Sequence, residues 1–463
     1  MNATGHLDAP GANSGVANPW LLKGALFSIL AFPPYMVLAP LGASGSVPQV
    51  LALLLFGLWG GSAILGLHNP VDYRHPGRAV VLLMILASCA SYLALFAGLS
   101  GSSTAMGRAA ADRWMLLILA SAGIAFATTE SVRRLEDAMQ LVRWLLAGAS
   151  VCCVIAIFQF VTRTDPLEAI TDYMIGFVKN TDVGSQPRGM FMRVAGTTMH
   201  PIELGVVSSM LLPLSVWRAV HDKQGSRLLH WITVALLVLA NAMTVSRSAL
   251  IGLLIALLVT IPFLPRVERI WAIVVAPLGA AMLFLTVPGL ITTMIAATTA
   301  GNTDPSITYR TNDYPLALRL LGDRPWLGIG PGTWIPTRPI DNFDNEYLLV
   351  AVTMGVVGLI AFIAYLLVPV LASFMAAWNA KENDISLLSA AVAAAGLIAT
   401  VTSGAFDSMS FPVFALLCPF FIGLSGGSWL IVKSQLETNR STLWESTPVH
   451  VPHNRRTQWI PFQ

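Results

Sequence analysis

The chain has 463 residues, of which 55% are hydrophobic and only 11% charged, and its formal net charge is +3 at pH 7. Soluble domains carry roughly 25% charged residues, so the composition excludes an ordinary soluble enzyme and predicts a polytopic membrane protein. The small net charge gives no sign of a nucleic-acid partner. All four cysteines (Cys89, Cys152, Cys153 and Cys418) fall in apolar stretches and indicate no disulfide framework.

Apolar runs of about 20 residues recur along the chain, and each can cross the roughly 30 Å of hydrocarbon in a bilayer. We therefore expect an all-α fold with about twelve transmembrane helices. Their approximate residues are 21–41, 47–67, 79–98, 114–129, 144–162, 201–219, 229–246, 248–264, 270–294, 347–377, 387–406 and 411–432. The polar residues before the first span lack the basic start of a signal peptide, so that span is expected to be retained.

The distribution of Lys and Arg over the short loops predicts the orientation. One set of loops holds eleven of them: Arg74, Arg78, Arg133, Arg134, Arg143, Arg218, Lys223, Arg227, Arg266, Arg269 and Lys381. The opposite set holds Arg108, Arg113 and Arg247. Because cytoplasmic loops carry the excess of positive charge, both termini are expected in the cytoplasm.

The chain therefore divides into a cytoplasmic tail (1–20), a transmembrane domain (21–432) and a cytoplasmic, disordered tail (433–463). Two long loops, near 163–201 and 297–346, are expected on the extracytoplasmic face. The apolar residues of Pro166–Asn180 recur at helical spacing, which predicts an amphipathic helix on the membrane surface. In the second loop a short helix is expected between Asp313, a cap, and Gly322, a terminator.

Candidate functional residues lie in and beside these loops. Arg193 stands in an apolar stretch near the membrane, where it binds an anion or reaches back to the interface. His200-Pro201 opens the sixth span. Glu203, in its first turn, is either a capping acid that complements the helix dipole or a functional acid beside His200.

Arg247 is the single charge between two apolar runs, and it lies on the side that the charge rule disfavours. Its planar fork suits phosphate oxygens, and simple anchoring at the interface is the alternative. Arg310 and Arg319 lie in the second loop, either on one face of its helix or as solvated charges. The run Gly328-Ile-Gly330-Pro-Gly332 lacks the residues of a nucleotide-binding loop and predicts a tight turn at a close backbone approach.

The segment Asp341-Asn-Phe-Asp344-Asn345-Glu346-Tyr347 opens the tenth span. Asp344 or Asn345 suits the N-cap of that helix, and Asp344 is the alternative candidate for a general base facing the arginines. The spacing of Asp341 and Asp344 is too common a pattern to assign a divalent ion. We predict no metal and no cofactor.

Together these stretches resemble the bacterial O-antigen ligase and O-antigen polymerase superfamily. The resemblance rests on Arg193 to Gly196 with His200-Pro201, Ser246-Arg247-Ser248-Ala249, Arg310, Pro325 to Gly332, and Asp344-Asn345-Glu346-Tyr347-Leu348 followed by Gly355 and Gly358. It covers roughly residues 190–365. In the ligases a histidine commonly stands where this chain has Asp344, which weakens the assignment as a lipopolysaccharide ligase but leaves the reaction class intact.

The resemblance implies an inverting, metal-independent glycosyltransferase in the bacterial inner membrane, with its active site on the extracytoplasmic face. The donor would be a glycan on a polyprenyl-pyrophosphate carrier, and the acceptor a hydroxyl of another glycan or of a lipid-linked molecule. Arg193, Arg247 and Arg310, with Arg319 and Asn345, would bind the substrate and its pyrophosphate. Asp344 would be the base, with His200 and Glu203 as competing candidates.

Within this class we favour polymerisation of a cell-surface polysaccharide over ligation to lipid A core. A transporter or flippase of lipid-linked sugars is the rival class, because transporters bind substrate near the membrane midplane with ionisable groups in broken helices. Here the charges gather in the outer loops instead. Membrane lipids and other envelope-assembly proteins are the remaining expected partners.

Overall fold

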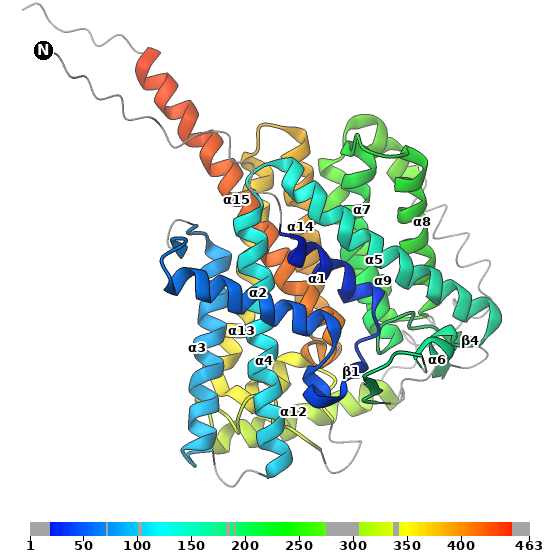
Figure 1. Ribbon diagram of the computed structural model, residues 1–463, viewed down its shortest axis with the longest axis vertical. Coiled ribbons are helices and arrows are strands. Elements are labelled where there is room, and N and C mark those ends of the chain that lie inside the picture. Colours follow the sequence, from blue (N-terminus) through cyan, green and yellow to red (C-terminus); the bar gives the residue numbers. More distant parts are fainter. Residues whose placement is uncertain are drawn as a thin grey trace, which may run out of the picture.

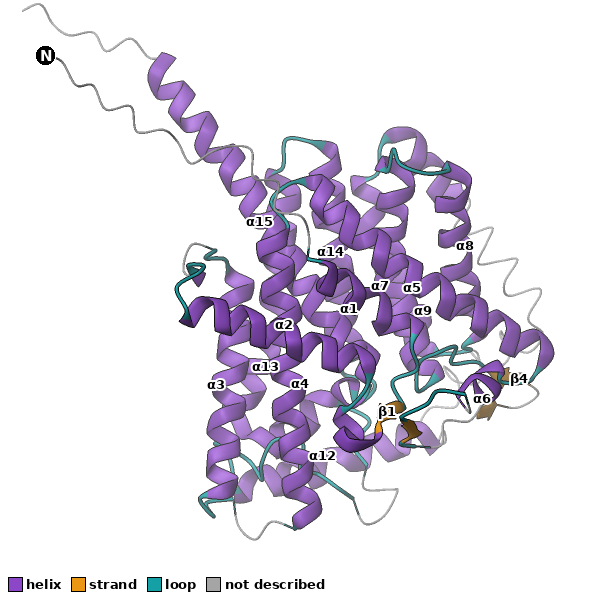
Figure 2. Ribbon diagram, in the orientation of Figure 1, coloured by secondary structure: helices purple, strands orange, loops and turns teal. Residues whose placement is uncertain are grey.

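The computed structural model describes residues 19–70, 73–100, 104–171, 173–181, 186–188, 191–274, 305–336 and 342–446. These residues form an almost wholly helical bundle (Figures 1 and 2). Helices α1 (Trp20–Ala31), α2 (Val47–Ile64) and α5 (Leu135–Thr162) slant across one face of it (Figure 1). The other long helices are α3 (Pro76–Phe96), α4 (Ala105–Ser131), α7 (Pro201–His221), α8 (Arg227–Met243), α9 (Arg247–Thr260), α12 (Pro305–Asp323), α13 (Glu346–Asn379), α14 (Asn383–Thr402) and α15 (Pro412–Ser446).

Eight of the described helices are long and apolar enough to cross a membrane: α2, α3, α4, α5, α7, α13, α14 and α15. Helices α1, α8 and α9 are apolar but shorter. Most of the span expected at 270–294 lies outside the described residues. The polytopic membrane character is therefore confirmed, and the number twelve stays a prediction.

Helices α7 and α15 form the centre of the bundle, since 83% of the apolar window of each is buried, against 22% for α2. Small residues permit this close packing. A Cβ on Gly205 of α7 would lie 2.5 Å from the Cβ of Ala249 in α9, and one on Gly252 would lie 2.8 Å from Ser209. Without a hydrophobic drive between helices in lipid, such backbone approach is a main source of packing energy.

Two expected elements in the outer part of the chain differ from the structure. The first span ends as a helix at Ala31, because Pro33 and Pro34 follow and proline cannot continue the backbone ladder. The amphipathic helix expected over Pro166–Asn180 is limited to α6 (Pro166–Thr171). The end of that segment is strand β2 (Phe177–Lys179), which pairs antiparallel with β1 (Met36–Leu38). A second pair joins β3 (Gln186–Arg188) to β4 (Phe191–Arg193), so the fold is not purely helical.

Other helices extend beyond their expected ends. Helix α15 continues to Ser446, so the tail expected to be disordered from Lys433 is helical there, supported by the Lys433–Glu437 ion pair at 3.7 Å. Helix α12 begins at Pro305, before the expected cap Asp313. Residues 1–18 and 447–463 of the two expected tails lie outside the described part.

Helix α13 is broken at Gly355, whose φ of 66° lies in the left-handed region. The loop Pro325–Gly332 occupies the break: the Gly330 N–H donates to Thr353 O at 2.9 Å and the Val356 N–H donates to Pro325 O at 2.8 Å. A Cβ on Gly355 would lie 2.3 Å from the Trp326 carbonyl, and one on Gly328 would lie 2.4 Å from that of Thr353. The close approach expected for this glycine run is thus confirmed.

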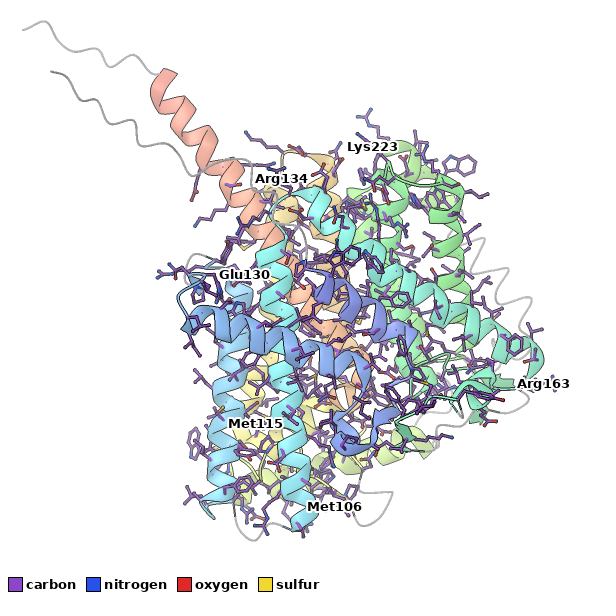
Figure 3. The ribbon with its side chains drawn as sticks, viewed as in Figure 1. Met106, Met115, Glu130, Arg134, Arg163 and Lys223 are labelled. Carbon is purple, nitrogen blue, oxygen red and sulfur yellow. The ribbon has the colours of Figure 1, made fainter. Side chains whose placement is uncertain are left out.

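The two ends of the bundle can be told apart by labelled residues. Arg134 and Lys223 lie at one end, here named the inner end, and Met106 and Arg163 lie toward the other, the outer end (Figure 3). Helix α4 begins at the outer end, and α7 begins there too because it finishes at His221, next to Lys223. The charge rule would place the inner end in the cytoplasm, which stays a prediction.

Candidate functional site

Glu203 joins the outer ends of α7 and α15. It is fully buried, and its Oε2 accepts the Met199 N–H at 2.9 Å. Its Oε1 accepts the N–H groups of Val413 and Phe414, at 2.8 and 3.1 Å, in the first turn of α15. One carboxylate therefore accepts from the residue that precedes the N-cap of α7 and from the first turn of α15, whose first N–H groups have no partner within their own helix. These contacts favour the capping interpretation of Glu203 over the catalytic one.

His200 is the N-cap of α7, and Pro201 is its first residue, as expected. The Nδ1 atom of His200 accepts the Ile202 N–H at 3.1 Å, and its ring lies 5.8 Å from that of Phe411. Burial, reinforced by the charge of Arg193, lowers the pKa of His200 to about 4. The ring is therefore neutral at pH 7 and carries its proton on Nε2, which makes it a weak general base and a good hydrogen-bond donor.

Arg193 is held against the turn that joins α8 to α9. It is only 8% exposed, and its Nε donates to Thr244 O at 2.9 Å. Val245, the next residue, has a φ of 48°, a conformation that costs free energy in a β-branched residue. Two residues further on, Arg247 begins α9. The fold thus brings Arg193 to the turn that leads into Arg247, although the two arginines lie 54 positions apart in the sequence.

Asp344 and Asn345 precede α13 at the same end of the bundle. Asn345 is the N-cap, and its Oδ1 accepts the N–H groups of Tyr347 at 3.0 Å and Leu348 at 3.4 Å. Asp344 is exposed. The capping role is therefore confirmed for Asn345, while Asp344 is left at the surface, where a base could reach an acceptor hydroxyl.

Two further carboxyl groups, which the sequence analysis did not assign, lie beside Asp344. Glu346 is fully buried, and its Oε2 accepts the Met409 N–H at 2.9 Å. Asp407 lies in the link between α14 and α15, two residues before Met409. Burial raises the pKa of Asp407 to about 6, and the charge of Asp344 adds to this rise. Asp344 and Asp407 therefore act on each other across a separation of 63 positions. Asp407 is a lone acid between two apolar runs, and this pattern could have indicated it from the sequence.

Arg310 and Arg319 both lie in α12, which crosses the outer end of the bundle (Figure 1). The two arginines are nine residues apart, which corresponds to two and a half helical turns. Their positions therefore fall on opposite sides of α12 and not on one face. Arg319 is exposed, and the side chain of Arg310 lies outside the described part of the chain. Ala317 of α12 packs with Phe343 and Val352, which fixes the helix against α13.

These carboxylates do not form a metal-binding group of the usual kind. Among the described residues, no cluster of three or more His, Cys, Asp or Glu side chains could hold a metal ion. Asp341, the expected partner of Asp344, lies outside the described residues. The site thus offers carboxyl groups, a neutral imidazole and guanidinium groups, which suit proton transfer and anion binding.

Comparison with known protein families identifies this part of the chain. Residues 232–363 match the family model described as O-Antigen ligase. The matched region contains Arg247, Asp344 and the break of α13 at Gly355, and it leaves out Arg193, His200 and Asp407. No curated protein matches the chain. The resemblance to the O-antigen ligase and polymerase superfamily is thereby confirmed for residues 232–363, which match the O-antigen ligase domain.

Proposed function

We propose that this protein is a membrane glycosyltransferase that moves a glycan from a polyprenyl-pyrophosphate carrier to an acceptor hydroxyl on the extracytoplasmic face. The observation that carries the proposal is the bond from Arg193 Nε to Thr244 O, which fixes one guanidinium group beside the start of α9 and Arg247. This bond orients the guanidinium group of Arg193, and the planar fork of a guanidinium group suits the oxygens of a diphosphate.

The chemistry requires stabilisation of a leaving group. As the sugar–oxygen bond breaks, negative charge grows on the diphosphate, and positioned guanidinium groups stabilise that charge most in a site with little water. Arg193 is almost wholly buried and Arg247 is half-buried, so both lie in such surroundings. Arg310 is the third arginine that we propose to bind the diphosphate. A single displacement of this kind inverts the configuration at the anomeric carbon, and these charges would stand in for a metal ion.

Asp344 is the proposed base. It must accept the proton of the acceptor hydroxyl while that oxygen attacks the anomeric carbon, and an exposed carboxylate at the outer end can reach it. His200 is less suited because burial and Arg193 lower its pKa to about 4, and Glu203 is occupied by three backbone N–H groups. Ligases of this superfamily commonly have histidine where Asp344 stands, which favours polymerisation of a surface polysaccharide over ligation to lipid A core.

A transporter of lipid-linked sugars is the alternative from another class, and the break of α13 at Gly355 is the feature that favours it. However, the loop Pro325–Gly332 fills that break with backbone hydrogen bonds. The buried acids Glu203 and Glu346 also lie in the first turns of their helices, away from the midplane. These features support surface chemistry over passage through the bundle.

Reconstitution of the purified chain with a polyprenyl-pyrophosphate oligosaccharide tests the proposal. We expect a ladder of lengthened products on a gel for a polymerase and one added unit for a ligase. Arg247→Lys should lower the turnover number about 100-fold or more, because an ammonium cannot supply the planar fork. The matched control is Arg218→Lys at the inner end, which should leave the turnover number unchanged. Wild-type turnover by Arg247→Lys would contradict the assignment of the diphosphate site.

A further inference from the structure

A cavity of about 330 Å³ lies at the outer end, beside the carboxyl groups described above. Met199 and Met409, which line it, donate their N–H groups to Glu203 and Glu346. Its volume falls within the range of about 300–1,000 Å³ typical of small-molecule sites. Most of the remaining lining comes from the segment between α1 and α2, the start of α2, helix α4 and the start of α13. Except for the α13 residues and the nearby Gly332 and Trp334, these lining residues lie outside the matched domain.

Three polar side chains from the N-terminal part of the chain line this cavity. Tyr35, Ser44 and Gln49 are 5%, 9% and 6% exposed. Within the described part of the chain, none of the three side chains makes a hydrogen bond. Gln49 lies in the first turn of α2, and Tyr35 and Ser44 lie in the segment between α1 and α2. Polar side chains that line a cavity and make no hydrogen bond within the described fold can bond to a polar ligand that enters it.

The remaining lining indicates the chemistry of that ligand. Trp114 presents an aromatic surface, Asn180 adds an amide, and Arg113 lies at the cavity without a carboxylate partner in the described structure. A lipid chain would leave the phenol, hydroxyl and amide groups unsatisfied. A free inorganic anion would be expected to meet more than one cation. A sugar ring has hydroxyl groups for the amides and phenol and an apolar C–H face for the indole.

We propose that this cavity is a saccharide subsite, which binds one sugar residue of the glycan next to the reaction centre through Gln49, Tyr35 and Trp114. The identity of the glycan as substrate rests on the proposed function above. Because hydrogen-bonding sites reject analogues that lack the partner group, Gln49 and Tyr35 would select which sugar is accepted, and Arg113 would favour a ring with an acidic substituent.

The test measures binding and transfer separately on the full-length chain in lipid nanodiscs. The probe for binding is the carrier-free oligosaccharide released by mild acid from the lipid-linked glycans of the cell that encodes this protein, titrated by calorimetry. Gln49→Leu should raise its Kd about tenfold, without lowering the thermal midpoint, because Gln49 has no partner within the described fold. Tyr35→Phe should raise the Kd by a smaller factor. Gln140→Leu, a half-buried glutamine of α5 toward the inner end, is the matched control and should leave the Kd unchanged.

The outcomes separate this inference from the proposed function. If the wild-type chain binds the oligosaccharide and Gln49→Leu does not, the subsite holds even where no transfer is detected. If the wild-type chain transfers the glycan while Gln49→Leu and Tyr35→Phe both keep the wild-type Kd and KM, the subsite is overturned and the function stands. Absence of binding to the wild-type chain would also overturn the subsite.

Discussion

At the inner end, the buried carboxylate of Asp222 lies between two guanidinium groups, whereas at the outer end the buried carboxylate of Glu203 is held by backbone N–H groups. Arg143 Nε donates to Asp222 at 2.9 Å and Arg218 Nε at 3.3 Å. Burial alone would raise the pKa of Asp222, but its hydrogen bonds to Arg143, Gln224 and Arg218 and the charge of Arg143 bring it to about 2.

The arginines at the two ends of the bundle also have different hydrogen-bond partners. At the inner end Arg78 lies 3.6 Å from Glu130, and Arg143 and Arg218 meet Asp222, whereas Arg193 at the outer end donates to the carbonyl oxygen of Thr244. Paired charges of the first kind join helices and cancel each other's fields. A guanidinium group that is positioned beside a substrate can stabilise negative charge that develops there. We therefore expect the inner end to contribute mainly to stability and the outer end to the proposed substrate binding, and each prediction below tests one side of that contrast.

The largest expected effect is on turnover, at Asp344. Asp344→Asn should lower the turnover number by about 10² to 10⁴, because loss of a general base typically costs that much. Asp344→His should retain part of the activity with an altered pH profile, since imidazole also accepts a proton. The measurement is transfer from a lipid-linked donor at several pH values. Asp323→Asn, an exposed acid of α12, is the control, and full activity of Asp344→Asn would remove Asp344 from the mechanism.

At the inner end, Arg143→Ala should act on stability. Removing one partner of a buried ion pair costs about 3–5 kcal/mol, and because Arg218 still faces Asp222 we expect a loss near the lower limit, about 3 kcal/mol. Unfolding in detergent measures this loss, and the turnover number of the folded fraction should stay at the wild-type value. A reduced turnover number with unchanged stability would show that the two ends are not divided as we argue.

Asp407→Asn should stabilise the protein above pH 6. The folded state binds a proton at Asp407 more tightly than the unfolded chain does, because burial raises its pKa to about 6. Wild-type stability should therefore fall as the pH rises from about 4 to 6 and then stay level, by about 3 kcal/mol for a shift of about two pKa units. Because asparagine does not ionise, the variant should not lose stability over this pH range. The difference in thermal midpoint between the two proteins should be largest at pH 8 and vanish below pH 4; a difference independent of pH would contradict it.

The smallest expected effect is at Glu203. Glu203→Gln replaces one carboxylate oxygen by an NH₂ group, which cannot accept a backbone N–H, and should cost about 1–3 kcal/mol of stability. Turnover of the folded fraction should be retained. Glu136→Gln, an exposed acid in the first turn of α5, should change neither quantity. A stable but inactive Glu203→Gln protein would instead support the catalytic alternative for this residue.

The parts of the site that sequence reasoning reached are those with local causes. Pro201 in a first helical turn, Asn345 as an N-cap and the tight turn of Gly328–Gly332 all follow from the conformational limits of single residues and their near neighbours. The β pairing of Phe177–Lys179 with Met36–Leu38 was missed because its partner strand lies far away in the sequence. The helical spacing of the apolar residues in that segment therefore predicted the wrong element.

By itself the sequence determined that this chain is a membrane protein, where most of its spans run, and that residues 232–363 resemble the O-antigen ligase and polymerase superfamily. Hydrophobic length and capping chemistry are properties of short segments, so they can be recognised without the fold. Only the tertiary structure decided that Arg193 meets the turn before Arg247, that Glu203 caps α15, and that Gln49 faces a polar cavity. These contacts depend on how closely distant helices pack, which glycines such as Gly205 permit but do not specify.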